Sequence, residues 1–187
     1  MSYLLVSLLL GVSSEPRYLS GLFFNFDQTS QVNVNGYVIN YDFYYENNLK
    51  KKQIKKEDID YSAQKSFEIS ILLLRRIEES HKDCRPYLDL NIYQITRSSL
   101  NGESFNVWKE SMGIPGKEIF GLYDPTAWIK GESCLLVGDN APITRGTLIH
   151  EFAHYWYDRW CLYGKIKMDT ETFARKVEYI YVNEHLE

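Results

Sequence analysis

The segment HEFAH at positions 150–154 sets the strictest geometric condition on how this chain folds. Positions i and i+4 share one face of an α-helix, so both imidazoles can reach a single tetrahedral cation such as zinc. Glu151 would project beside them, toward a water molecule on that cation. The segment therefore predicts a helix that carries a metal site, with His150 and His154 as ligands and Glu151 beside the water on that metal.

The residues around this segment also favour a helix, which we expect to span positions 144–163. A second helix is expected over positions 169–185, after a turn at Gly164. Large apolar side chains on the first helix should pack it into a core. They are Leu148, Ile149, Phe152, Trp156 and Trp160.

The second of these helices offers two candidates for a third ligand, Glu171 and Glu178. Glu171 follows His154 by 17 residues, which is enough for the first helix to end and the chain to return antiparallel. Glu178 lies about 10 Å further along the helix axis, so the two carboxylates cannot bind one metal together. We expect Glu171 to be the ligand, and Glu178 to accept a hydrogen bond from a ligand or to lie on the surface.

The remainder of the chain alternates between strand and helix patterns. Tyr-rich and Val-rich alternation over positions 17–48, with Asn35-Gly36 between two runs, predicts a pair of strands. A helical period follows over 57–82, then a strand over 87–96, a loop containing Gly102, Gly113, Pro115 and Gly116, and two short strands within 119–137. This order predicts an α+β fold.

The composition of the chain limits the classes of function that it can have. The chain has 187 residues, of which 44% are hydrophobic, as expected for one globular domain. Its formal net charge is -4, with 21 basic and 25 acidic residues, which argues against a general nucleic-acid binder. No apolar run reaches the roughly 20 residues of a membrane span.

The amino-terminal region is expected to contain two parts, a signal segment that is removed and a β segment with a basic connector. Residues 1–14 contain no charged side chain and are typical of a short secretory signal, which predicts a secreted protein; a buried first strand in a cytoplasmic protein is the alternative. Residues 15–187 then form one domain, which begins with a Tyr-rich β segment and a basic connector at positions 15–56. Three cysteines, Cys84, Cys134 and Cys161, show no CxxC spacing, so we expect either one disulfide and one free thiol or three buried thiols.

The HEFAH segment and Glu171 in its ETFAR context together resemble the gluzincin type of zincin-like metallopeptidase. This resemblance covers positions 119–178. It implies a small mixed sheet with a backing helix, an active-site helix and a carboxy-terminal helix that carries the third ligand. Positions 121–123 would belong to the edge strand of that sheet, with 134–137 as its neighbour, and an extended peptide substrate would pair with the edge.

The resemblance also implies a mechanism. One zinc ion would be held by His150, His154 and Glu171, leaving a fourth position for water, and Glu151 would move the proton from that water to the leaving amine. Metal-binding histidines usually have their second nitrogen held by a carboxylate or carbonyl, and we expect Asp158 or Asp169 in this role.

Other readings stay open. Gluzincins often place a Tyr or His beyond the third ligand to stabilise the oxyanion, and here only Tyr179, Tyr181 and His185 follow, of which the tyrosines fit packing roles better. The context of Cys134 is similar to the cysteine ligand of peptide deformylases, although the spacing is short and the glycine-rich segment is missing. A non-catalytic zincin-fold binding or scaffold protein, recognising partners through its Tyr-rich strands, is the alternative to an enzyme.

Overall fold

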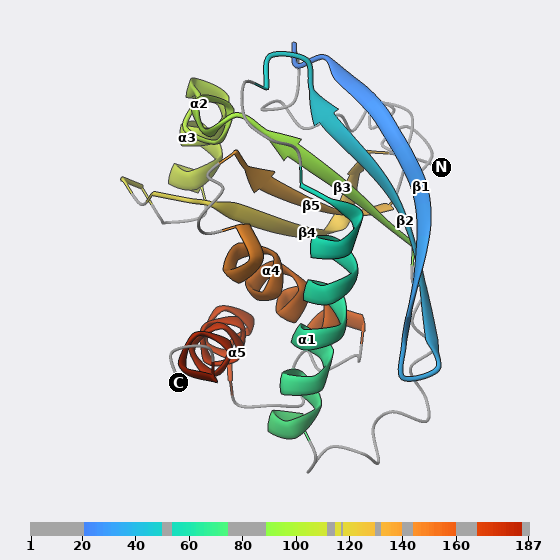
Figure 1. Cartoon of the computed structure of the whole chain (residues 1–187). Helices are drawn as coiled ribbons and strands as arrows, with labels where there is room; N and C mark the ends of the chain where they lie inside the picture. The colour runs from blue at the N-terminus through green and yellow to red at the C-terminus, as the bar shows by residue number, and fades with distance from the viewer. Residues whose placement is uncertain are drawn as a thin grey trace, which may run out of the picture.

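The computed structural model has an α+β fold built on a five-stranded mixed sheet (Figure 1). It describes residues 21–49, 54–74, 89–111, 115–116, 118–129, 132–139, 144–159 and 168–184. The predicted signal segment 1–14, the cysteines Cys84 and Cys161, Trp160 and the turn at Gly164 all lie outside the described residues.

The predicted amino-terminal pair of strands is confirmed as an antiparallel hairpin of β1 (Phe24–Val34) and β2 (Tyr37–Glu46). Asn35 and Gly36 both have positive φ, 49° and 88°, as a tight hairpin turn with right-handed twist requires. The Asn33 side chain accepts a hydrogen bond from the Gly36 backbone N–H at 3.0 Å and fixes the turn. The Asn-Gly pair therefore sets the register of the hairpin.

The sheet continues from β2 through β3 (Asp89–Ile95) and β5 (Glu132–Gly138) to β4 (Gly121–Ile129). β2 pairs parallel with β3 and β3 parallel with β5, whereas β4 runs antiparallel to β5 and forms an edge. The prediction of an edge strand at 121–123 beside 134–137 is thus confirmed.

Three long helices lie on one side of the sheet (Figure 1). α1 (Lys56–Leu74) and α4 (Thr144–Arg159) pack next to the strands, and α5 (Thr170–Glu184) packs on α4. Six α4 side chains have no exposed surface in this core, and burial of a Leu, Ile or Phe side chain stabilises a fold by about 1.5–3 kcal/mol. They are Leu148, Ile149, Phe152, Ala153, Tyr155 and Trp156. None of the helices within the described residues has the length and apolar character needed to cross a membrane.

The expectation of a loop after β3 is wrong in part, because two short helices lie there: α2 (Arg97–Leu100) and α3 (Glu103–Ser111). The side chain of Thr96 accepts a hydrogen bond from the Ser99 backbone N–H and caps α2. Leu100 and Phe105 from these helices fill a second, smaller cluster with residues of β3 and β5. Helices this short bury too few apolar residues to show a helical period in the sequence.

Candidate metal centre

α4 presents both histidines of the HEFAH segment on one face. The opposite face is fixed to α1, where the Ser66 hydroxyl donates to the Ile149 carbonyl at 2.9 Å and the Trp156 indole N–H donates to the Ala63 carbonyl at 3.2 Å. The side chains of His150 and His154 keep 15% and 12% of their surface accessible. The core therefore positions the helix that carries the two imidazoles.

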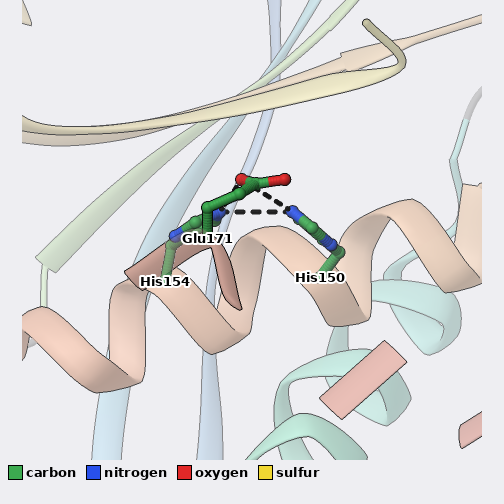
Figure 2. Close-up of side chains that lie close together, drawn as sticks. All are labelled: His150, His154 and Glu171. Carbon is green, nitrogen blue, oxygen red and sulfur yellow. Dashed lines mark hydrogen bonds and ion pairs between the residues drawn. The ribbon is translucent and has the colours of Figure 1, made fainter. Parts of the chain in front are cut away.

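α5 brings Glu171 to these histidines from its first turn. Asp169 caps the helix by accepting a hydrogen bond from the Thr172 backbone N–H at 2.8 Å. The buried residues Phe173, Ala174 and Val177 hold α5 against the core. Figure 2 shows Glu171 above the two imidazoles, with all three side chains turned toward one another. The choice of Glu171 over Glu178 as the residue beside both histidines is consistent with this placement.

The spacing of the three donor atoms fits a tetrahedral metal ion. The Nε2 atoms of His150 and His154 lie 3.2 Å apart, and Oε2 of Glu171 lies 3.6 Å and 3.3 Å from them. For bonds of about 2.0–2.1 Å, two ligands of a tetrahedral zinc ion are about 3.3–3.4 Å apart. One ion could therefore contact all three donors with little adjustment, and no fourth donor joins this group among the described residues.

The other polar atom of each ligand has a partner of its own, and all of these partners lie on α5. His150 Nδ1 lies 2.9 Å from Oε2 of Glu178, and His154 Nδ1 lies 2.7 Å from the Thr170 hydroxyl. The Arg175 guanidinium donates to Oε1 of Glu171 at 2.7 Å. Hydrogen bonds at Nδ1 turn the Nε2 lone pairs toward the centre, where they suit a cation.

The electrostatics of the group also suit a cation, because three carboxylates surround two imidazoles. Burial lowers the pKa of His150, but the hydrogen bonds with Glu171 and Glu178 outweigh it and raise that pKa to about 10. Hydrogen bonds from His150 and His154 lower the pKa of Glu171. The carboxylates thus favour a positive charge on the imidazoles, and a divalent ion could take the place of the proton.

Glu151 lies next to the three ligands without belonging to their group. Its side chain is 5% exposed and is buried between α4 and β4. Burial raises the pKa of its carboxyl, an effect that the neighbouring His150 and His154 oppose. Glu151 is therefore an acidic side chain close to the histidines that is not one of the three donors.

The expected partners of the histidines are wrong. Asp158 accepts a hydrogen bond from the Tyr123 hydroxyl at 2.6 Å, and Asp169 caps α5. Thr170 holds His154 instead. Thr170 could have been predicted from its position next to Glu171 in the first turn of α5. A side chain there can contact the same histidine as Glu171 does. Glu178 lies against Nδ1 of His150, one of the two positions expected for a carboxylate outside the metal site.

Cys134 lies outside the metal centre. Its side chain is buried in the smaller cluster, with Leu136 and Tyr93, whereas Leu135 on the same strand faces the α4 side. Burial raises the pKa of the thiol, and a metal ligand must be a thiolate. The described residues that could hold a metal are His150, His154 and Glu171, so the deformylase-like site is not supported.

The tyrosines considered for an oxyanion role occupy other positions. Tyr181 packs against Tyr61 of α1, with ring centroids 6.5 Å apart, and Tyr179 is 71% exposed. These are the positions of a packing residue and a surface residue. His185 lies outside the described residues.

Comparison of the chain with protein-family models, with curated proteins and with solved structures gave no match. The interpretation of the centre therefore rests on its own geometry. That geometry is a His/His/Glu group on an α+β fold, with donors spaced to hold one metal ion.

Proposed function

We propose that the protein is a zinc-dependent peptidase of the gluzincin type. His150, His154 and Glu171 would hold one zinc ion, and Glu151 would be the general base. One observation carries this proposal: three donors lie at tetrahedral spacing while a further acidic side chain, Glu151, is buried beside them and outside the donor set. A purely structural metal site is usually closed by a fourth protein ligand, whereas a hydrolytic site keeps that position open.

The residues of the chain divide the reaction among them. Zinc, when bound, polarises the scissile carbonyl and lowers the pKa of water toward neutrality. The Glu151 carboxylate accepts a proton from the attacking water and then donates it to the nitrogen of the leaving amine. Glu178 and Thr170 keep the two imidazoles oriented, and Arg175 holds Oε1 of Glu171 so that Oε2 faces the metal.

The substrate class follows from β4. This strand is an edge of the sheet next to α4, and its outer N–H and C=O groups can pair with an extended chain. A peptide bound in this way would run past the open coordination position. We therefore propose an extended peptide or protein segment as the substrate.

The proposal is tested with Glu151→Gln, which keeps the size of the side chain and removes the base. We expect bound zinc to be retained at one ion per chain and cleavage of a peptide library to fall at least about 100-fold. Glu68→Gln, on the exposed surface of α1, is the matched control and should cleave as the unmodified protein does. Cleavage that survives in Glu151→Gln, or that survives removal of zinc by a chelator, would contradict the proposal.

A further inference from the structure

β4 lies along one stripe of α4, formed by Thr147, Glu151, Tyr155 and Asp158 at helical spacing. Near its start the strand is fixed by Tyr123, whose hydroxyl donates to Asp158 at 2.6 Å and whose ring packs edge-on against Tyr155 at 5.9 Å. The strand begins with Gly121. The strand is thus held in place on the helix that carries the metal ligands.

Gly121 leaves no room for a side chain. A Cβ at this position would lie 2.6 Å from Cγ2 of Thr147, 2.7 Å from Oε1 of Glu151 and 2.9 Å from Cγ of Glu151. Real Cβ atoms essentially never approach another heavy atom within 3.0 Å, so something would have to move. The Glu151 carboxylate therefore occupies the space that any residue other than glycine would fill.

The geometry points to Gly121 as a positioning residue for Glu151, an inference that rests on the proposed function. The Glu151 side chain packs against the backbone of β4 at Gly121, and Thr147, one turn earlier on α4, packs against the same position. Glu151 has three rotatable side-chain bonds and no metal bond to fix it. The close approach of β4 supplies the missing restraint, because the carboxylate is buried against the strand.

Gly138 is also tightly surrounded among the described residues of the sheet, but it has no such role. A Cβ on Gly138 would meet Cδ1 of Leu100 at 2.8 Å and the Phe120 carbonyl oxygen at 3.3 Å, on the side of α2. The closer atom is the end of a flexible side chain and can shift. Gly138→Ala is therefore a matched control for Gly121→Ala, with the same substitution in a neighbouring strand.

The test compares Gly121→Ala with Gly138→Ala in the zinc-loaded protein. We expect Gly121→Ala to lower kcat about 100-fold, because a 1 Å misplacement of a catalytic group has an effect of that size. KM and zinc affinity should stay within about twofold, since the histidines and Glu171 are not touched. Gly138→Ala should change none of these values appreciably. Equal kcat values for Gly121→Ala and Gly138→Ala would overturn the inference.

A second variant separates Glu151 from general packing. Thr147→Ser removes Cγ2, the closest atom to the new methyl group, so Gly121→Ala/Thr147→Ser should unfold at a higher temperature than Gly121→Ala while kcat stays low. Recovery of kcat in the double variant would overturn the inference, because the defect would then arise through Thr147.

A crystal structure of the same variants gives a readout that does not depend on turnover. In Gly121→Ala the Glu151 carboxylate should be displaced beyond the roughly 0.5 Å within which catalytic groups must be held. A carboxylate that stays in place would overturn the inference. If the unmodified protein cleaves no peptide, the proposed function fails, and the position of Glu151 still decides whether Gly121 sets it.

Discussion

The two helices of the metal centre contribute in different ways. α4 provides two candidate ligands, His150 and His154, whose i, i+4 spacing places them on one helix face. α5 provides the third candidate, Glu171, and the outer partners of all three, namely Thr170, Arg175 and Glu178. The geometry on α4 is therefore local, whereas the geometry on α5 exists only while α5 packs on α4.

This difference assigns separate tasks to the helices. Loss of a histidine on α4 would leave only two of the three donors of the proposed zinc site. Loss of an outer partner on α5 leaves three donors present but less well oriented, and such losses typically weaken metal binding 10- to 100-fold. Substitutions on the two helices should therefore form a graded series in zinc affinity.

The largest effect is expected for His154→Ala, which removes an α4 ligand. Zinc affinity should fall by more than the 10- to 100-fold range of an outer partner, because only two donors remain. Competition with a chromophoric chelator measures the change. In excess chelator, the variant and the unmodified protein should unfold at similar temperatures, since α4 is fixed by its buried apolar face. Near-normal zinc affinity would show that His154 is not a ligand.

An intermediate effect is expected for Glu178→Gln on α5. The amide oxygen can still accept from His150 Nδ1, but the charge that strengthens this hydrogen bond is gone. Zinc affinity should fall about 10-fold, the lower end of the range for an outer partner. Glu184→Gln is the matched control, because Glu184 pairs with Lys65 at 2.8 Å on the surface of the same helix. Equal zinc affinities for the two variants would remove Glu178 from the centre.

The same contrast explains how much of the molecule could be predicted from its sequence. The i, i+4 spacing of His150 and His154 places both ligands on one helix face without knowledge of the fold. The Asn35-Gly36 turn is equally local, because its positive φ values follow from residue type. The position of Glu171 could be predicted for a related reason. A short connection after α4 brings the first turn of α5 back to the two histidines.

The contacts that could not be predicted are those set by how one element packs on another. Thr170 rather than Asp158 holds His154 because of where the first turn of α5 docks, and Asp158 turns instead to Tyr123 on β4. The close approach of Gly121 to Glu151 likewise joins residues 30 positions apart. Periodicity carries no information about such pairs. The helices α2 and α3 were not predicted for another reason, because they contain few buried residues.

The smallest effect in the series is expected for Thr170→Val, which keeps the shape of the side chain and removes the hydroxyl 2.7 Å from His154 Nδ1. A neutral partner contributes less than the Glu178 carboxylate, so zinc affinity should fall less than in Glu178→Gln. Thr172→Val is the control, because its hydroxyl bonds Asp169 in the same helical turn and lies outside the ligand contacts. A larger loss for Thr170→Val than for Glu178→Gln would reverse the ranking and make the hydroxyl the stronger anchor of the centre.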